Sequence, residues 1–306
     1  MNKYPKVTVG VLTWNQKKDV LECLESIVRM TYPNYDVVVI DNGSRDGTSE
    51  AVKEHFPNVH YVYNSENLGC AEGQNCEIRE AIKLGSEYLF TIANDAIVEP
   101  STLTELVREA EKDPRIAFAF PKVYHYGTNK IWFAKGARIS EIDWRRGLVT
   151  GHIQNTEDNP ECDIFCDADI YPGGFCMVRL EAVQKGGFLN TSYNIFFDDT
   201  EWQVRVIKAG YRGRYVPTAR TWHKPSSSLG MESERFYYYR TRNRLRFFSE
   251  YSPKRYFIMF LLRFFSFELP FETLYRLCRS GAFKQAAAVL EGIKDFFLGK
   301  KGMWRK

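Results

Sequence analysis

The chain has 306 residues, 44% of them hydrophobic and 26% charged, and this composition excludes a disordered protein. The net charge of +4 is unevenly distributed, because residues 235–306 hold 16 Lys and Arg against 5 Asp and Glu, whereas residues 1–234 hold 26 against 33. A basic, aromatic tail on an acidic body indicates a polyanionic surface as its partner, either a membrane or a nucleic acid.

Residues 6–120 alternate short β-branched runs with helical patterns, which predicts an α/β fold with a doubly wound, mostly parallel central sheet. Strands are expected at residues 7–12, 37–40, 59–63 and 88–92. Apolar residues from Val20 to Val28 recur at helical spacing, and Tyr32-Pro33 is expected to end that helix.

The second half of the chain has a different character. Residues 121–169 are irregular and are expected to add strands and loops, whereas the chain after Ser228 reads as a long basic, aromatic helical region. No segment reaches the ~20 apolar residues needed to span a bilayer. The nearest, residues 256–271, is interrupted by Arg263 and Glu268 and is expected to be an interfacial or a buried helix.

The 7 cysteines form no regular framework, and the chain starts with a strand pattern and no secretory signal. We therefore expect a reducing, cytoplasmic environment. Cys162, Cys166 and Cys176 are candidates for a zinc site, although no fourth ligand stands at a recognisable spacing.

Ligands of doubly wound sheets bind beyond the carboxyl ends of the strands. The polar residues there are Thr13 and Asn15, then Asp41, then residues 64–67, then Asn94 and Asp95. Neither GxGxxG nor GxxxxGK[ST] follows the first strand, so glycine amides cannot hold a diphosphate there. A divalent cation is the alternative partner for a diphosphate.

Each candidate also has a structural explanation. Asp41 can accept a hydrogen bond from a pyrimidine imide N–H, or it can form an Asx turn that begins the next helix. Asn94 and Asp95 can meet a metal or form a turn.

Asp198 and Asp199, with Glu201 close by, are crowded carboxylates of the kind that bind metals or transfer protons, although helix N-termini also favour acidic residues. His223 is either a ligand or a structural residue. Residues 226–228, all serine, indicate a mobile loop over the donor.

The order of these motifs resembles family 2 glycosyltransferases with the GT-A fold, and most of all the rhamnosyltransferase-type enzymes of that family. The resemblance covers roughly residues 5–250 and rests on Thr13-Trp14-Asn15, Asp41-Asn42-Gly43-Ser44, Asp46-Gly47-Thr48, Asn67-Leu68-Gly69, Gly73 to Asn75, Ala93-Asn94-Asp95, Gly173-Gly174, Asp198-Asp199 with Arg205, Gly210-Tyr211 and His223. It implies an inverting transfer from a nucleoside-diphosphate sugar, with dTDP-rhamnose favoured over a UDP-hexose.

The resemblance also implies residue roles. Donor contacts fall to Thr13, Asn15, Asp41, Asn67 and Asn94, and acceptor contacts to Gly173, Gly174, Asp198 and Trp202. Asp95 and His223 would hold Mg²⁺ or Mn²⁺, and Asp199 would be the general base. Trp202 can stack on a sugar or fill the core.

Two departures from the family pattern stand out. Ala93 occupies the position where the metal motif usually begins with Asp or Asn, which keeps a catalytically inactive scaffold as an alternative. The paired-acid motif begins with Asp198 and not Glu, and it has Trp202 where Leu is usual. A sugar nucleotidyltransferase is disfavoured, because residues 12–15 lack the basic, glycine-rich loop that binds a triphosphate.

We therefore expect a GT-A domain at residues 1–234, with the nucleotide-binding part at about 1–120 and the acceptor part at about 121–234. Residues 235–306 are expected to associate peripherally with the inner face of the cell membrane, where a glycan or lipid-linked acceptor would be found. A nucleic-acid partner is not expected, because no RNA-binding motif accompanies the tail. The alternative is that the arginines of the tail bind substrate phosphates while its aromatic residues pack on the body.

Overall fold

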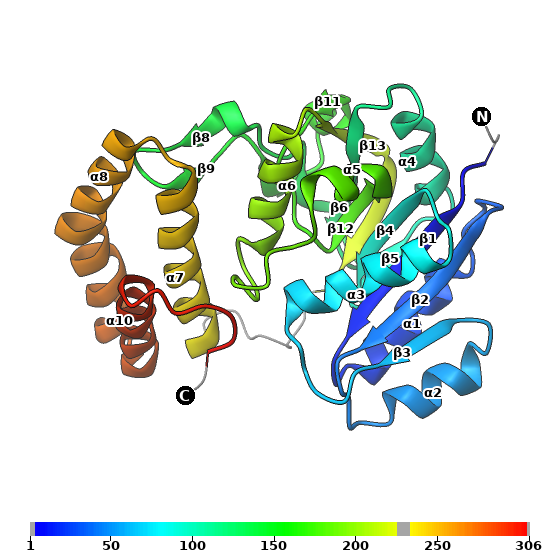
Figure 1. The fold of residues 1–306 in the computed structure, drawn as a ribbon, viewed down its shortest axis with the longest axis horizontal. Coiled ribbons are helices and arrows are strands. Elements are labelled where there is room, and N and C mark those ends of the chain that lie inside the picture. The colour runs from blue at the N-terminus through cyan, green and yellow to red at the C-terminus, as the bar shows by residue number, and fades with distance from the viewer. Residues whose placement is uncertain (1–3, 225–232, 305–306) are drawn as a thin grey trace.

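The computed structural model describes residues 4–224 and 233–304, so the serine loop expected at residues 226–228 lies outside the described residues. Strands and helices alternate in the first part of the chain, and helices alone make up its end (Figure 1). The strands are β1 (Val7–Thr13), β2 (Tyr35–Asp41), β3 (His60–Tyr63), β4 (Tyr88–Ala93), β5 (Ala96–Val98), β6 (Ile116–His125), β7 (Lys130–Ala134), β8 (Ile142–Asp143), β9 (Leu148–Val149), β10 (Ile153–Glu157), β11 (Cys166–Asp167), β12 (Phe175–Arg179) and β13 (Arg212–His223). The helices are α1 (Lys17–Ile27), α2 (Thr48–His55), α3 (Cys70–Lys83), α4 (Thr102–Ala110), α5 (Leu180–Gly186), α6 (Asp198–Lys208), α7 (Glu234–Tyr251), α8 (Lys254–Arg263), the π-helix η3 (Phe264–Leu274), α9 (Tyr275–Arg279) and α10 (Phe283–Phe297).

The central sheet has the strand order β10-β7-β6-β12-β4-β1-β2-β3, and β13 runs parallel to β6. Strand β1 pairs in parallel with β2 and β4, and β2 with β3, whereas β12 is antiparallel to both β4 and β6. This confirms the doubly wound, mostly parallel sheet expected from the sequence. The parallel half brings the carboxyl ends of β1, β2 and β4 to one edge.

Burial explains why the strand sequences are nearly continuous apolar runs. Val7, Val9 and Val11 of β1 have no exposed surface, and helix α3 packs on β1, β2 and β4. A Cβ at Gly10 would lie 2.8 Å from the Glu77 carboxyl carbon, so glycine allows α3 to approach β1 closely.

Helix α1 ends at Ile27, earlier than the expected end at Tyr32-Pro33. Tyr32 is 3% exposed and its hydroxyl donates to the Pro5 carbonyl at 2.7 Å. Because this ring anchors the connection to β2 in the core, the chain leaves the helix before the proline is reached.

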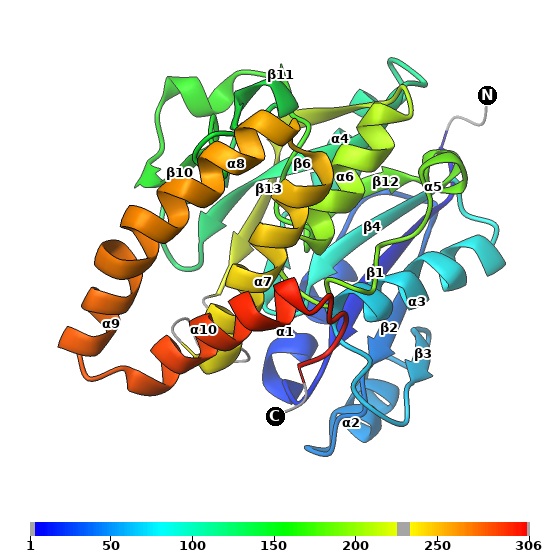
Figure 2. The same ribbon diagram turned by 60° about the vertical axis from the view of Figure 1, so that its left-hand side comes forward.

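The helices after β13 form a separate layer beside the sheet (Figures 1 and 2). Helix α7 packs along α10, and the β8–β9 hairpin reaches over to this layer. A Cβ at Gly147 in that hairpin would lie 2.6 Å from the Phe260 ring of α8. The predicted helical extension is therefore confirmed, and in the described ranges 4–224 and 233–304 no helix is long and apolar enough to cross a membrane.

Several arginines of α7 make their contacts inside the protein and not at its surface. Arg242 and Arg246 are 1% and 8% exposed, and Arg244 pairs with Glu268. Aromatic residues on either side of these arginines are buried as well, namely Tyr238, Tyr239, Phe247 and Phe248. The expectation that the arginines face a polyanionic surface is therefore wrong for Arg242, Arg244 and Arg246, whereas Arg235 and Arg240 of the same helix are exposed. The packing of the buried aromatic residues follows the alternative.

Candidate functional site

A cavity of about 530 Å³ opens beyond the carboxyl end of β4. Its lining includes Ala93 at the end of β4, Gly173 and Gly174 before β12, Asp198 and Asp199 at the start of α6, and His223 at the end of β13. Trp132, Phe175, Phe196, Phe197 and Phe236 add aromatic walls. The fold thus brings five predicted site residues from three separate segments to one cavity.

Asp199 is held in part by Gly173, one of the two glycines expected to contact the acceptor. Its Oδ2 accepts a hydrogen bond from the Gly173 N–H at 2.9 Å, and its Oδ1 accepts from the Thr200 N–H at 2.6 Å. A Cβ at Gly173 would lie 2.7 Å from the Asp199 Cβ, so a larger residue there would push the carboxylate away.

The two adjacent carboxylates differ in their surroundings. Burial, and then the charge of Asp199, raises the pKa of Asp198 far above its ordinary value. Burial also raises the pKa of Asp199, but the N–H groups of Gly173 and Thr200 act against it by stabilising the ionised form. A proton shared by the pair therefore resides on Asp198, and Asp199 ionises first.

The segment before α6 has an unusual backbone. Asn194, Phe196 and Phe197 have φ angles of 65°, 61° and 64°, a left-handed conformation that non-glycine residues seldom adopt. Phe196 and Phe197 line the cavity directly before Asp198. The orientation of the carboxylates therefore depends on whatever holds this segment in place.

Helix α7 holds the strained segment. The Asn243 side-chain amide, which is fully buried, donates to the carbonyls of Tyr193, Ile195 and Phe196 at 2.7, 2.7 and 2.9 Å. Arg242 donates to the Asn243 Oδ1 at 3.0 Å and so fixes the orientation of the amide. Sequence reasoning missed Asn243, because its partners lie 47 to 50 residues earlier and no local pattern indicates them.

Asp95 and His223, the two residues expected to hold a metal, lie next to each other, and His223 also lines the cavity. The pairing of β13 with β5 places the His223 Nε2 3.3 Å from the Asp95 Oδ1. The ring of Trp132 packs against His223 with centroids 4.4 Å apart. Within the described part of the chain, the Asp95 Oδ1 and the His223 Nδ1 are buried without a hydrogen-bond partner.

The Asp95 Oδ1 faces the His223 Nε2, whereas the His223 Nδ1 lies on a different edge of the ring. The buried, unpartnered Asp95 oxygen fits a cation held together with the Nε2, because it would otherwise carry an uncompensated desolvation cost. The described residues contain no group of three or more His, Cys, Asp or Glu side chains that could hold a metal. The three cysteines that were candidates for a zinc site therefore do not form one. Asp95 and His223 would thus hold a cation as a pair, with further ligands from water or the ligand. Ala93 faces this cavity and adds no ligand, as the sequence indicated.

Thr13, Asn15 and Asn94 link the neighbouring strand ends to one another. The Asn94 amide donates to the Thr13 hydroxyl at 2.9 Å, and Asn15, at a φ of 51°, accepts from the Arg45 N–H at 2.8 Å. Asn67 caps the turn before α3 by accepting from the Gly69 N–H at 2.9 Å. These residues lie beside the cavity and are not part of its lining.

Asp41 forms the Asx turn that was the structural alternative for it. Its Oδ1 accepts from the Ser44 N–H at 2.7 Å, its Oδ2 accepts from the Tyr61 hydroxyl, and the residue has no exposed surface. A base N–H would therefore share an oxygen that is already engaged. The contact between Asp41 and a pyrimidine stays a prediction.

The expectation that Trp202 contacts an acceptor sugar is wrong. Trp202 is 3% exposed, its indole N–H donates to the Gly187 carbonyl at 2.9 Å, and its ring meets the edge of Phe118. It lies one turn into α6 on the face that packs on the sheet. Its neighbour Glu201 also points away from the cavity and pairs with Arg205 at 2.9 Å.

Comparisons with known proteins identify the family and the fold. Residues 8–187 match the model of the family described as glycosyl transferase family 2. Among relatives, the chain is 23% identical over 242 residues to the N-acetylglucosaminyl-diphospho-decaprenol L-rhamnosyltransferase of Mycobacterium tuberculosis, covering 73% of this chain and 78% of that protein. It is 21% identical over 244 residues to the poly-beta-1,6-N-acetyl-D-glucosamine synthase of Staphylococcus aureus, covering 75% of this chain but only 54% of that protein.

Two solved structures share the fold. GalNAc-T7, crystallised with UDP, GalNAc and Mn²⁺, superposes with a TM-score of 0.64 at 15% identity, over 84% of this chain and 49% of that one. The mannosyltransferase PcManGT from Pyrobaculum calidifontis, in complex with GDP-Man and Mn²⁺, gives 0.59 at 17% identity, over 98% and 89%. The family match covers more than half of the chain, and with the GT-A architecture it establishes that this protein is a glycosyltransferase of glycosyl transferase family 2.

Proposed function

We propose that the protein transfers a sugar, with inversion, from a nucleoside-diphosphate sugar to a saccharide acceptor of a cell-surface glycan. The observation that carries the proposal is the position of Asp199, which lies beside Gly173 in a cavity that His223, the neighbour of Asp95, also lines. This arrangement supplies a base on one side of the reacting carbon and a place for the leaving group on the other.

Asp199 acts on the acceptor. Its carboxylate takes the proton of the acceptor hydroxyl, whose oxygen bonds to the anomeric carbon as the bond from that carbon to the diphosphate breaks. Asp198 keeps its own proton, and its neutral form limits the negative charge beside the base. Gly173 and Gly174 leave room for the acceptor sugar above Asp199.

Asp95 and His223 bind the diphosphate end of the donor. A divalent cation, Mn²⁺ or Mg²⁺, held by these two residues would offset the charge that develops on the leaving oxygen. The two structural neighbours named above were crystallised with Mn²⁺, which supports this choice of cofactor. Because Ala93 adds no ligand, the cation would bind weakly until the diphosphate is present.

Thr13, Asn15, Asp41, Asn67 and Asn94 form the nucleoside side of the site. The imide edge of thymine or uracil matches a carboxylate such as that of Asp41, so dTDP and UDP are the candidate nucleotides. The L-rhamnosyltransferase named above favours dTDP-rhamnose as the donor and a lipid-linked saccharide as the acceptor.

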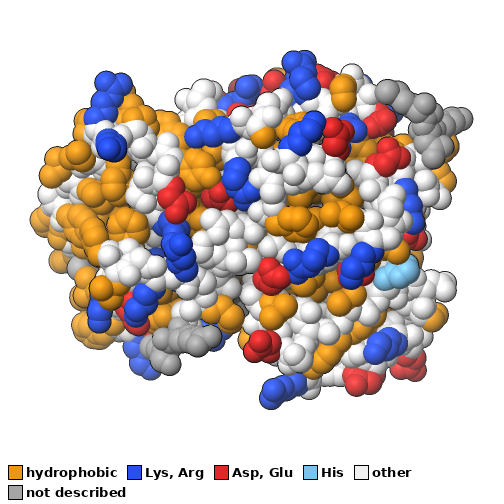
Figure 3. Space-filling model, viewed as in Figure 1, with side chains coloured by type: hydrophobic (Ala, Val, Ile, Leu, Met, Phe, Trp, Pro, Cys, Tyr) orange, Lys and Arg blue, Asp and Glu red, His pale blue; other side chains and the backbone are white. Residues whose placement is uncertain are grey.

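Such an acceptor would be reached at the inner face of the cell membrane. Exposed apolar side chains gather on the last helices, including Leu262 at 65%, Phe271 at 60% and Phe297 at 62% exposure. In Figure 3 the hydrophobic surface on the left covers α8 and α10. Together with the basic residues around them, this surface supports a peripheral membrane contact.

A nucleotide-sugar panel tests the proposal. The melting temperature would be measured with dTDP-rhamnose, UDP-hexoses and GDP-mannose in the presence of Mn²⁺, because the true donor stabilises the fold by mass action. Release of nucleoside diphosphate would then be followed with the best donor. A panel that gives neither a shift nor any release above background would favour the inactive scaffold.

The metal site has a test of its own. Asp95→Ala should weaken donor binding and lower the dependence on Mn²⁺ together, by about tenfold or more, because one of two protein ligands is lost. His223→Ala should show the same defect in milder form. Equal activity of the wild-type protein in EDTA and in Mn²⁺ would exclude a metal role for this pair.

A further inference from the structure

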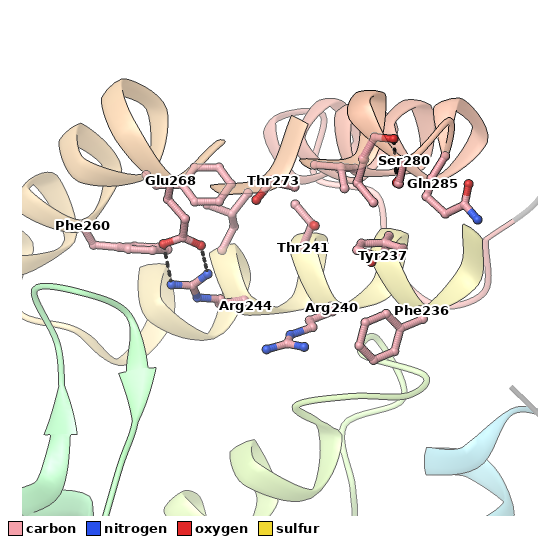
Figure 4. Close-up of a pocket in the computed structure, with 15 residues that line it drawn as sticks. Phe236, Tyr237, Arg240, Thr241, Arg244, Phe260, Glu268, Thr273, Ser280 and Gln285 are labelled. Atoms are coloured by element: carbon pink, nitrogen blue, oxygen red, sulfur yellow. Dashed lines mark hydrogen bonds and ion pairs between the residues drawn. The ribbon is translucent and has the colours of Figure 1, made fainter. Parts of the chain in front are cut away.

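A second cavity, of about 650 Å³, lies in the helical layer between α7, η3 and α10 (Figure 4). Its apolar walls include Phe260, Phe264, Leu277 and Val289. Phe236 and Arg240 line both this cavity and the one that holds Asp199. These two side chains therefore form a border that the helical cavity and the catalytic cavity share.

Arg240 differs from the three arginines that follow it in α7. Arg242 bonds to backbone carbonyls, Arg244 pairs with Glu268, and Arg246 pairs with Glu250. Arg240 lies over the Phe236 ring at 5.4 Å and forms no ion pair with any acidic side chain in the described ranges. In Figure 4 it points away from α8 and α10, toward the side of the catalytic domain.

The electrostatic surroundings of Arg240 agree with this geometry. Partial desolvation, and then the charge of Arg244, lowers the pKa of Arg240, while Glu268 acts weakly in the opposite direction. A guanidinium in this setting is suited to an anion that arrives with a ligand, since arginine binds phosphate groups through several parallel hydrogen bonds.

Four features of the molecule follow one another from the exposed surface of the last helices to the catalytic cavity. An exposed apolar surface on α8, η3 and α10 comes first, then the cavity with its apolar walls, then Arg240, then Asp199. A lipid-linked acceptor has the same order of parts, with a hydrocarbon chain, a diphosphate and a sugar.

The geometry points to Arg240 as the residue that binds the diphosphate of a lipid-diphosphate-linked acceptor, with the hydrocarbon chain in the cavity between α7, η3 and α10. This inference rests on the proposed glycosyl transfer and specifies its acceptor. The sugar attached to the diphosphate would then enter the catalytic cavity next to Asp199. The charge of the diphosphate and the length of the hydrocarbon both contribute to acceptor binding.

The experiment measures binding of three probes to the full chain in EDTA, which removes any metal-dependent diphosphate binding. The probes are farnesyl diphosphate, farnesol and inorganic pyrophosphate. We expect farnesyl diphosphate to bind about tenfold or more tightly than either of the others. Arg240→Ala should reduce its affinity to that of farnesol, about a ten- to hundredfold loss, as for a lost charge-assisted hydrogen bond.

Two further variants complete the design. Arg235→Ala removes an exposed arginine of the same helix that lines neither cavity, and it should bind farnesyl diphosphate as the wild type does. Thr273→Trp fills the partly exposed side of the helical cavity and should weaken farnesol and farnesyl diphosphate alike, with an unchanged melting temperature.

Several outcomes would overturn the inference. If Arg240→Ala binds farnesyl diphosphate as tightly as the wild type does, Arg240 does not bind the diphosphate. If Thr273→Trp does so, the hydrocarbon chain does not lie in the helical cavity. If Arg240→Ala weakens binding to phosphatidylglycerol vesicles and leaves farnesyl diphosphate unaffected, Arg240 contacts the membrane surface instead. Nucleoside diphosphate release by the wild-type protein tests the proposed function separately. The proposed glycosyl transfer and the inference about the acceptor can therefore fail independently of each other.

Discussion

Asp198 and Asp199 show how two identical side chains, adjacent in sequence, acquire different tasks. Asp199 receives the Gly173 N–H from another segment, whereas Asp198 is 4% exposed and lies beside the charge of its neighbour. The difference in pKa follows from these contacts and not from residue type. It is consistent with the proposed role of Asp199 as the base.

Asp199→Asn should lower turnover by about two to four orders of magnitude, because the amide cannot accept the proton. Donor binding should stay near normal, since Asp199 lies on the acceptor side. The measurement is kcat for sugar transfer together with the donor dissociation constant. Asp198→Asn is the matched control and should keep far more activity than Asp199→Asn. If Asp199→Asn retained more than a tenth of wild-type turnover, another group would be the base.

Glu77 is a second unusual carboxyl group, buried under β1 and away from the cavity. Burial raises its pKa from 4.5 to about 8, although the Thr91 hydroxyl donates to it at 2.5 Å. A raised folded-state pKa contributes stability that is present below the unfolded value and lost as the pH rises through the folded value.

Glu77→Gln should therefore remove a decline in stability between about pH 4.5 and 8. The free energy of unfolding of the variant, relative to wild type, should rise by about 1.4 kcal/mol per pH unit in that window and level off above it. Urea unfolding at several pH values measures this difference. Glu80→Gln, on the partly exposed side of α3, is the control, and a pH-independent difference for Glu77→Gln would contradict the assignment.

At the scale of elements, α7 is the helix that connects the two layers of the molecule. One face holds the strained carbonyls before α6, and another packs along α10. The helix therefore restrains the segment that leads into Asp198 and Asp199, the carboxylates proposed to act on the acceptor.

Asn243→Ala should lower kcat by tenfold or more while the donor dissociation constant changes little, because the segment 193–197 loses its restraint but the strand ends stay in place. Stability should fall by about 1–3 kcal/mol, since buried carbonyls lose their donor. Ser249→Ala removes a hydroxyl that bonds to the Arg246 carbonyl of its own helix, and it is the control. A parallel loss of donor binding and turnover would indicate a general structural role.

The elements differ in how well the sequence predicts them. The ends of β1, β2 and β4 can be predicted from their runs of β-branched residues, and Asp199 can be singled out by its motif. Both patterns lie within short stretches of the sequence. Trp202 was misjudged, since the face of α6 that packs on the sheet is decided by tertiary contacts. Asn243 had no signal at all, because its partners are the carbonyls of a segment about 50 residues away.

At the scale of the whole molecule, the exposed apolar side chains are concentrated on the last helices. Removal of these helices is a poor test of membrane binding, because α10 covers α7 and truncation would expose Tyr238 and Tyr239. Surface substitutions leave this packing intact.

Phe267→Ser combined with Phe271→Ser should greatly reduce sedimentation with anionic liposomes. The two rings are 50% and 60% exposed, and burial of one phenylalanine in an apolar phase is worth about 1.5–3 kcal/mol. The pair Ile164→Ser and Phe165→Ser, also exposed but outside the helical layer, is the control. Equal sedimentation of the two double variants would show that the helical layer is not the membrane contact.

The dependence of the 193–197 segment on α7 also sets an order of events during synthesis. Strands β1 to β4 leave the ribosome first and have most of their pairing partners within the first part of the chain, so they can fold early. The restraint on the catalytic segment arrives only when Asn243 has been made, and Arg242 in turn bonds to the carbonyl of Gly302, 60 residues later. A growing chain can therefore pair its parallel strands well before the segment with Asp198 and Asp199 is fully restrained, and that restraint is complete only when the residues up to Gly302 have been made.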